Sequence, residues 1–374
     1  MTYREIAGLK VSLLGFGCMR FPTGADGQVD KAETKKMLEL AYESGVTYYD
    51  TAYPYHGGTS ERITSDVMKQ FPRESFYYAT KLPCWEVHTL DDAKRLFKVQ
   101  LDRLQTDYVD FYLLHALNRE SWKRMKDLGV VEYFEGLQME GKIKRYGFSF
   151  HDEYDVFEDI IYYRKWEFCQ IQLNYMDTDY QAGLKGVEDC VKQGTAIVIM
   201  EPVKGGSLAT FADEDIAHLK AAAPNDSPAR WALRYVGSIP AVSVILSGMS
   251  NMEQLKDNLE TFDDFKPLTD SESNVLDTHI ERVKNKSNIG CTWCNYCMPC
   301  PSGVNIPRIF GLWNDYAKYN NPGHVKWNWE HEIPASKKPS NCISCGACEG
   351  HCPQHLPIIE SLKKANAEIE ALCK

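Results

Sequence analysis

The chain alternates strand-like and helix-like segments through its first 265 residues, and this alternation restricts the possible folds more than any other feature. Short runs rich in β-branched and aromatic residues recur between segments with helical periodicity. The eight strand-like runs cover residues 10–16, 46–50, 76–81, 108–115, 144–150, 168–174, 195–200 and 241–247. Eight strands with intervening helices in about 250 residues suit an α/β fold that closes as a (β/α)8 TIM barrel better than an open sheet.

Capping residues mark the beginnings of several predicted helices. Asp30 and Glu33 form a pair typical of a helix start, and the helix that follows is expected to end at Gly45. A later helix is expected to begin at Asn251, with Gln254 in the reciprocal capping position. These signals divide the chain into the repeating units that a barrel requires.

The repeating pattern ends at a joint containing proline, at residues 266–268, and a further helix is predicted over 270–284. We therefore expect a barrel domain of residues 1–285 and a smaller domain of residues 286–374. Within the second domain, the polar stretch 318–340 contains several Pro and Gly residues, so we predict a connecting loop there.

The overall charge and hydropathy exclude several classes of protein. The formal net charge is −10, whereas nucleic-acid-binding proteins need a basic face for phosphate contacts. No apolar run approaches the roughly 18 residues of a membrane span, and residues 1–10 have no basic-then-apolar signal pattern. We expect a cytoplasmic protein that binds neither nucleic acid nor membrane.

Chemically active side chains lie at the ends of three consecutive predicted strands. Asp50, Lys81 and His115 end the second, third and fourth strands, and Tyr55 follows in the loop after Asp50. Because neighbouring strands lie about 4.8 Å apart, these side chains can converge. A lysine cation beside a phenol favours phenolate and lowers the tyrosine pKa from about 10, which makes Tyr55 a candidate acid. Any one of them alone would more simply be a rim or surface residue, but all four in order favour a catalytic site.

The stretches that contain these residues resemble the aldo-keto reductases. The matching sequences are GVTYYDTA at 45–52 together with Tyr55, the ATK that ends at Lys81, and the LLH that ends at His115. This resemblance implies a TIM barrel that reduces an aldehyde or ketone with NADPH or NADH, or catalyses the reverse oxidation of an alcohol. It also implies that Tyr55 is the general acid, that Lys81 and Asp50 tune it, and that His115 orients the substrate carbonyl.

The same resemblance implies where NADP or NAD would bind. The nucleotide would lie across the barrel mouth, with Ser149 and Gln172 near its carboxamide and residues 248–258 at its adenosine end. The implied nucleotide-binding residues are Gly17, Met19, Arg20, Ser149, Gln172, Met200, Pro202, Gly248, Gln254 and Asn258.

Two positions depart from the family pattern. Met200 stands where many members stack an aromatic ring on the nicotinamide, and Gln254 stands where an arginine commonly binds the 2′-phosphate of NADP. The choice between NADP and NAD therefore stays open. A Rossmann site is disfavoured, because the glycine pair at 15–17 lacks the third glycine of the fingerprint and no helix start follows.

Eight of the thirteen cysteines lie between residues 291 and 352. They form two runs, Cys291-x2-Cys294-x2-Cys297-x2-Cys300-Pro and Cys342-x2-Cys345-x2-Cys348-x3-Cys352-Pro. The second run fits the bacterial ferredoxin pattern for a [4Fe–4S] cluster, and the first differs by one residue in its last spacing. Zinc sites use paired knuckles, so we expect two [4Fe–4S] clusters rather than zinc.

The ligand sets follow from the logic of two-cluster ferredoxins, in which the fourth cysteine of each run binds the other cluster. The first expected set is Cys291, Cys294, Cys297 and Cys352. The second expected set is Cys300, Cys342, Cys345 and Cys348. Helical patterns after each run predict a small helical ferredoxin-like domain, whereas the isolated thiols Cys18, Cys84, Cys169, Cys190 and Cys373 are expected to be inert.

The barrel and cluster runs together resemble the iron–sulfur branch of the aldo-keto reductases. Hydride transfer moves two electrons at once, whereas a [4Fe–4S] cluster passes one, and the sequence has no clear flavin signature. Three functions stay open. The first is a carbonyl reductase or alcohol dehydrogenase acting on a small molecule, with structural, regulatory or electron-releasing clusters. The second is a protein that exchanges single electrons with ferredoxin or flavodoxin and uses the barrel for non-hydride chemistry. The third is a sensor or binding module.

The resemblance also predicts a place for the cluster domain. The C-terminal segment of family members closes over the barrel mouth, so we expect the cluster domain to border the active site. Trp293 and Trp313 are candidate pocket walls. The simpler interpretation of both is packing around a cluster.

Overall fold

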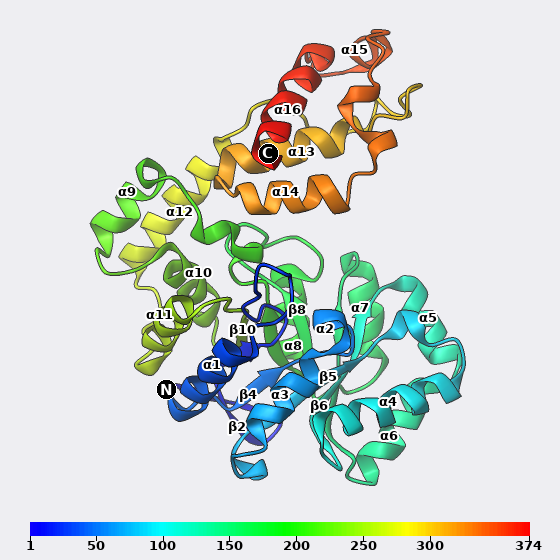
Figure 1. Cartoon of the computed structure of the whole chain (residues 1–374), viewed down its shortest axis with the longest axis vertical. Coiled ribbons are helices and arrows are strands. Elements are labelled where there is room, and N and C mark those ends of the chain that lie inside the picture. Colours follow the sequence, from blue (N-terminus) through cyan, green and yellow to red (C-terminus); the bar gives the residue numbers. More distant parts are fainter. The chain divides into compact units, whose positions relative to one another are not determined.

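The computed structural model describes all 374 residues of the chain (Figure 1). The chain forms two compact units. The barrel unit comprises Met1–Pro202 and Arg230–Leu268, and the cluster unit comprises Val203–Ala229 and Thr269–Lys374. The expected division at residue 285 stays a prediction, since the compact units divide the chain at other points.

Eight parallel strands close into a barrel in the order β10-β3-β4-β5-β6-β7-β8-β9. Their bounds are β3 (Leu14–Gly17), β4 (Tyr48–Asp50), β5 (Tyr77–Leu82), β6 (Val109–Leu117), β7 (Ile143–Phe150), β8 (Phe168–Gln172), β9 (Ala196–Met200) and β10 (Val242–Ser247). Side chains such as Tyr48, Phe111, Phe168 and Val244 form a buried core cluster, as expected for a barrel whose interior is packed. The predicted (β/α)8 barrel is confirmed.

The first predicted strand, at 10–16, is wrong in its extent. Its first residues belong to β2 (Leu9–Ser12), which pairs antiparallel with β1 (Tyr3–Ile6) in a hairpin outside the barrel sheet. The turn residues Ala7 and Gly8 both have positive φ, 45° and 84°, the conformation that two-residue hairpin turns favour. An alanine at the first of these positions gives no such turn signal in the sequence.

Helices follow the strands and lie outside the barrel (Figure 1). Those of the barrel unit are α1 (Lys31–Glu43), α2 (Tyr55–Gly58), α3 (Ser60–Met68), α4 (Leu90–Leu104), α5 (Arg119–Asp127), α6 (Val130–Met139), α7 (Tyr154–Tyr163), α8 (Gly183–Gln193), most of α10 (Pro228–Gly237), and α11 (Met252–Asp263). Two predicted starts are confirmed, because Asp30 caps α1 and Asn251 caps α11 through side-chain oxygens.

The cluster unit is helical. It contains α9 (Asp213–Ala222), α12 (Asp270–Asn285), α13 (Ile306–Tyr319), α14 (Pro322–His331), α15 (Ala347–His351) and α16 (Ile358–Cys373). Its core includes Ile309, Trp313, Trp329 and Leu362. The helical patterns after both cysteine runs are therefore confirmed as α13 and α16.

The loop predicted at 318–340 is wrong, because α14 lies within it. The Asn321 side chain caps this helix by accepting from the His324 N–H, and Pro322 occupies its first position. Val325 and Trp329 are buried in the core. With so few apolar anchors the helical period is faint, so packing rather than local pattern specifies this helix.

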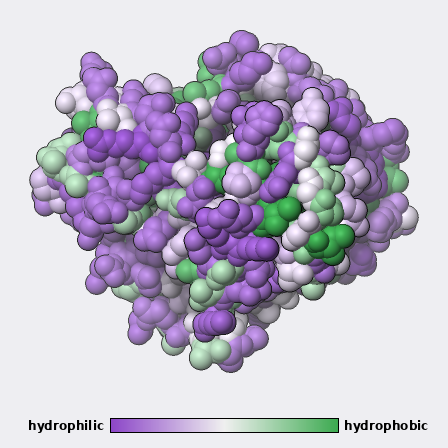
Figure 2. All heavy atoms as spheres, turned by 90° about the horizontal axis from the view of Figure 1, so that it is seen from above, coloured by the Kyte–Doolittle hydropathy of each residue, from purple (hydrophilic) through white to green (hydrophobic).

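The face shown in Figure 2 carries mostly hydrophilic residues, with apolar side chains in small patches. Scattered apolar residues of this kind are ordinary on a protein surface. None of the helices has both the length and the apolar character needed to cross a membrane.

Candidate active site

The four predicted catalytic residues come from one edge of the barrel. Asp50 ends β4, Lys81 is the penultimate residue of β5, His115 lies in the last part of β6, and Tyr55 begins α2 directly after β4. The strands are parallel, so their carboxyl ends meet at one end of the barrel, where the active sites of such folds lie.

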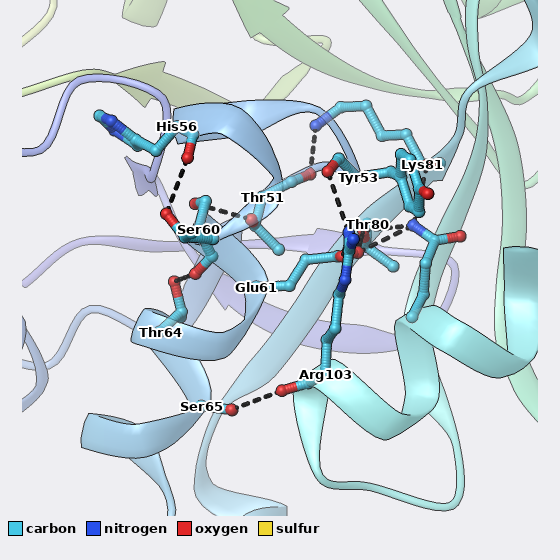
Figure 3. A network of polar contacts seen from close by, with 12 residues as sticks. Thr51, Tyr53, His56, Ser60, Glu61, Thr64, Ser65, Thr80, Lys81 and Arg103 are labelled. Atoms are coloured by element: carbon cyan, nitrogen blue, oxygen red, sulfur yellow. Dashed lines mark hydrogen bonds and ion pairs between the residues drawn. The ribbon is translucent and has the colours of Figure 1, made fainter. Parts of the chain in front are cut away.

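Lys81 is completely buried and held by two oxygen acceptors, of which Figure 3 shows Thr51. Its Nζ donates to Asp50 Oδ1 at 2.7 Å and to the Thr51 carbonyl at 2.8 Å. Burial alone would lower the pKa of Lys81, but the Asp50 charge and Tyr55 together raise that pKa above its ordinary value. The amine is therefore a fixed positive charge at neutral pH.

The Tyr55 ring lies close both to this amine and to His115. Lys81 Nζ lies 5.2 Å from the Tyr55 ring centroid, and the Tyr55 and His115 ring centroids are 5.9 Å apart in an edge-on arrangement. Burial raises the pKa of the Tyr55 phenol, and the Lys81 charge and hydrogen bond offset only part of that rise. The expectation of a lowered Tyr55 pKa is wrong in direction, because it considered the effect of the lysine charge and not the larger effect of burial. The phenol keeps its proton at neutral pH.

His115 supplies an uncharged imidazole. Burial, then the Lys81 charge and then His151, lower the pKa of His115 well below its ordinary value. Its ring also contacts Trp85 of the 3-10 helix η2 (Cys84–Glu86), with centroids 5.0 Å apart. The buried Nδ1 has no hydrogen-bond partner. A neutral ring of this kind can hydrogen-bond a ligand oxygen without taking the phenol's proton.

A residue that the sequence reasoning missed lies beside Ser149. Gln170 of β8 is the Cα partner of Ser149 in β7. Its side chain is buried, its Nε2 donates to Met200 Sδ at 3.6 Å, and its Oε1 has no partner. Because a buried unpaired amide oxygen costs free energy, it marks a place where a ligand could donate a hydrogen bond.

The predicted Gln172 lies two residues farther along the same strand. Its Nε2 already donates to Asp177 Oδ2 at 3.3 Å. Residues two apart in a strand face the same side, so this spacing offered Gln170 as readily as Gln172. The Ser149 hydroxyl oxygen accepts from the Ala116 N–H at 2.7 Å, which ties it to the strand that carries His115.

Other residues predicted to bind the nucleotide gather where β3, β9 and β10 end. Gly17 ends β3, and Met200 ends β9 directly before Glu201 and Pro202. A Cβ on Gly17 would lie 3.1 Å from the Ser247 carbonyl oxygen, and one on Gly248 would lie 2.7 Å from Arg20 Cγ. The segments after β3 and β10 therefore lie in contact. Met19, in the segment after β3, is exposed.

Two more of the predicted nucleotide ligands have structural partners. Gln254 Oε1 accepts from the Ser250 N–H at 2.8 Å, so it closes the capping pair at the start of α11. Asn258 is buried, and its Nδ2 donates to Ser247 Oγ at 2.6 Å. Both amides therefore hold the end of β10 against α11.

In the cluster unit, the first expected ligand set lines one open pocket. Cys291, Cys294, Cys297 and Cys352 face it together with apolar residues that include Phe310. Four thiols in an apolar pocket fit the needs of a [4Fe–4S] cluster. No group of three or more His, Cys, Asp or Glu side chains is placed to hold a single metal ion.

The second expected set has no buried member, whereas Cys352 of the first set is buried. Cys300, Cys342 and Cys348 are half-buried against the helical core, whereas Cys345 is exposed. Both ligand sets stay predictions.

The two candidate tryptophans pack within the cluster unit. Trp313 is buried, and its Nε1 donates to Glu368 Oε2 at 2.6 Å. Trp293 is 49% exposed and lies close over Gly311 of α13. Their predicted role as pocket walls stays a prediction.

The sequence itself matches two families in the same order as the two parts of the chain. Residues 13–281 match the aldo/keto reductase family, and residues 290–356 match a 4Fe-4S dicluster domain. This chain belongs to the aldo/keto reductase family. It is an oxidoreductase of that family with a C-terminal 4Fe-4S domain of ferredoxin-like type.

Curated relatives cover most of the barrel. The chain is 27% identical over 312 residues to the uncharacterized oxidoreductase YqkF of Bacillus subtilis, covering 73% of this chain and 94% of that one. It is 26% identical over 331 residues to L-galactose dehydrogenase of Arabidopsis thaliana, covering 80% and 96%. It is 26% identical over 267 residues to methylglyoxal reductase YeaE of Escherichia coli, covering 67% and 88%.

A solved relative supports the same fold. The holo form of aldo-keto reductase AKR11C1 from Bacillus halodurans is similar with a TM-score of 0.62 and 25% identity, over 75% of this chain and 96% of that chain. Its apo form gives a TM-score of 0.60 and 27% identity, over 75% and 95%.

Proposed function

We propose that this protein reduces the carbonyl of an aldehyde or ketone to an alcohol with NADPH or NADH, or catalyses the reverse, and that Tyr55 is the general acid. The observation that carries the proposal is the buried Lys81 amine, which donates to the Asp50 carboxylate and lies near the Tyr55 ring. The neutral His115 imidazole lies next to that ring. Two relatives are named as a dehydrogenase of L-galactose and a reductase of methylglyoxal, which supports an alcohol–carbonyl couple.

The nicotinamide, when bound, supplies a hydride to the carbonyl carbon. The Tyr55 hydroxyl donates its proton to the carbonyl oxygen, and the charged Lys81 amine stabilises the phenolate that remains. Asp50 keeps that amine charged within the protein interior. His115, being neutral, hydrogen-bonds the carbonyl oxygen and orients it toward the phenol.

We propose Ser149 and Gln170 as the groups nearest the nicotinamide carboxamide. Gln170 supports this role through its unpaired Oε1, which can accept from an amide N–H. The adenosine end would lie along the contact between the segments after β3 and β10. Because Gln254 is already used as a helix cap, NADH and NADPH are both candidates.

We also propose that residues 286–374 bind two [4Fe–4S] clusters through the eight cysteines of the two runs. The cavity that Cys291, Cys294, Cys297 and Cys352 line supports the first cluster. Each cluster transfers one electron at a time. We therefore propose a ferredoxin or flavodoxin as a partner only if the clusters release electrons from the protein.

The proposal is tested with the full-length protein purified without oxygen and assayed with NADH and NADPH on a panel of aldehydes and ketones. Tyr55→Phe should lower kcat by about 10² to 10⁴-fold, the usual contribution of a general acid, and leave nucleotide affinity unchanged. Tyr48→Phe is the matched control, because the Tyr48 hydroxyl is buried in the barrel without a partner. A Tyr55→Phe enzyme with undiminished kcat would rule out the assigned acid.

A further inference from the structure

A buried carboxylate that the proposed chemistry does not use is hydrogen-bonded to Thr80, the residue before Lys81. Glu61, the second residue of α3, has no exposed surface. Its Oε1 accepts from the Thr80 hydroxyl at 2.6 Å and from the Gln100 amide at 2.8 Å, and its Oε2 accepts from Arg103 Nη1 at 3.2 Å. A charge is buried at a tolerable free energy only when it is paired and fully hydrogen-bonded, as this one is.

One side of this network fixes the strand that carries Lys81. Thr80 directly precedes Lys81 in β5, and Figure 3 shows its hydroxyl beside the Glu61 carboxylate. The Gln100 amide that donates to Glu61 also donates to the Lys81 carbonyl at 2.9 Å. Gln100 Oε1, on the same amide, accepts from the Tyr112 hydroxyl at 2.7 Å. The backbone of β5 is therefore held at the base of the lysine side chain.

The other side of the network fixes the loop that leads to Tyr55. Arg103 extends from α4 toward the loop (Figure 3), and its Nη1 also donates to the Tyr53 carbonyl at 3.1 Å. Its guanidinium lies 4.2 Å from the Tyr53 ring centroid. Tyr53 is two residues before Tyr55, so Glu61 holds the arginine that holds this loop.

The same loop is anchored at its beginning. The Thr51 carbonyl accepts from Lys81 Nζ, and the Thr51 hydroxyl donates to Ser60 Oγ at 2.9 Å, at the start of α3. The loop between β4 and α2 is thus held between Lys81, Ser60 and Arg103.

We infer that Glu61 is a positioning residue for the proposed reduction: through Thr80, Gln100 and Arg103 it sets the separation between the Lys81 amine and the Tyr55 hydroxyl. The inference rests on the proposed function. Glu61 contacts neither reacting group directly, and it acts on the two backbone segments that carry them. Misplacement of a catalytic group by about 1 Å can lower a rate by about 10²-fold, so this separation has a large effect on turnover.

A second buried carboxylate provides a matched control. Asp110, at the start of β6, pairs with Arg73 at 2.6 Å and accepts from the Tyr78 N–H at 2.9 Å. Burial raises the pKa of both Glu61 and Asp110. Asp110 contacts β5 at Tyr78, three residues before Lys81, and so lies away from the amine.

The test compares Glu61→Gln with Asp110→Asn in the full-length holoenzyme, measuring kcat, KM and the pH dependence of kcat/KM for carbonyl reduction. Glu61→Gln should lower kcat by about 10- to 100-fold with little change in the KM for the nucleotide. It should also move the alkaline limb of the pH profile to higher pH, because a more distant Lys81 stabilises the phenolate less. Removing the Glu61 negative charge would by itself lower the pKa of Tyr55, so movement of this limb to higher pH reports geometry.

Asp110→Asn should keep the wild-type kcat, and the alkaline limb of its kcat/KM profile should stay at the wild-type pH. Arg103→Lys retains the charge on a partly exposed side chain but cannot form the same fork of hydrogen bonds. It should move the limb in the same direction as Glu61→Gln, and it carries the test if Glu61→Gln does not fold.

The outcomes separate this inference from the proposed function. If Tyr55→Phe loses activity but Glu61→Gln and Arg103→Lys keep the wild-type limb, the inference is overturned and the proposed function stands. Equal losses of kcat in Glu61→Gln and Asp110→Asn, with an unmoved limb, would also overturn it by showing a general structural effect. If Tyr55→Phe keeps full activity, the proposed function fails and the inference fails with it.

Discussion

Replacing Asp50 by Asn should destabilise the barrel unit strongly, because it leaves the Lys81 charge in the protein interior without its counter-ion. The Lys81 side chain is 0% exposed and that of Asp50 is 4% exposed, with Nζ and Oδ1 2.7 Å apart. Removing one partner of a buried pair costs about 3–5 kcal/mol. The Thr51 carbonyl remains as an acceptor, so we expect a loss near the lower end, about 3 kcal/mol.

The pH dependence of this loss has a definite sign. In the wild type the pKa of Lys81 lies above its ordinary value, so the charged amine stabilises the fold below that ordinary value, about 10.4, and the contribution disappears as pH rises through the folded-state pKa. In Asp50→Asn, burial is no longer opposed by the carboxylate and lowers the pKa of Lys81. The difference between the two proteins should therefore be greatest at neutral pH and shrink toward pH 10.

Hydrogen exchange measured by mass spectrometry on peptides from β5 gives the free energy of opening of the barrel unit by itself. The matched control is Asp66→Asn, whose carboxylate is 46% exposed and lies 3.4 Å from Lys69 Nζ. Surface pairs of this kind contribute about 0–1 kcal/mol. An Asp50→Asn protein as stable as Asp66→Asn at pH 7 would refute the interpretation of Lys81 as a buried, charged amine.

Three further outcomes test the cluster unit and the two buried imidazoles. Cys352→Ser should lose about half of the iron and sulfide, whereas Cys373→Ser should keep all of it, and full metal content in Cys352→Ser would contradict the assigned ligand set. Because the pKa of His115 is lowered, kcat/KM should not fall as pH drops through about 6.5; a limb there that His115→Asn abolishes would contradict a neutral imidazole. Burial lowers the pKa of His279 to about 4, so the cluster unit should lose about 3 kcal/mol between about pH 6.5 and that value. Hydrogen exchange on α12 measures this loss, and a flat profile would contradict it.

Features that depend on neighbouring residues were predictable from the sequence. The barrel strands and the caps at Asp30 and Asn251 follow from local periodicity and from side chains that reach the next turn of the chain. The helix α14 and the hairpin of β1 and β2 were not predicted. Buried contacts specify α14, and the hairpin turn at Ala7 has a residue that rarely takes its conformation.

The candidate site divides in the same way. Strand ends predicted the convergence of Asp50, Lys81 and His115, because parallel strands place their carboxyl ends together. The direction of the Tyr55 pKa could not be predicted, since it depends on burial that only the folded chain shows. Glu61 gave no signal at all, because a glutamate in the first turn of a helix is ordinarily exposed and its partners are 19 to 42 residues away.

The most direct test of hydride transfer at this site follows deuterium from C4 of the reduced nicotinamide into the product of an accepted carbonyl substrate, under anaerobic conditions. Hydride transfer with proton donation by Tyr55 predicts one deuterium on the carbinol carbon and a hydroxyl proton from water. Tyr55→Phe should slow the transfer without changing its position. The contradicting result has two parts. The carbinol hydrogen would come from water, and enzyme with chemically reduced clusters would form the product equally well without nucleotide.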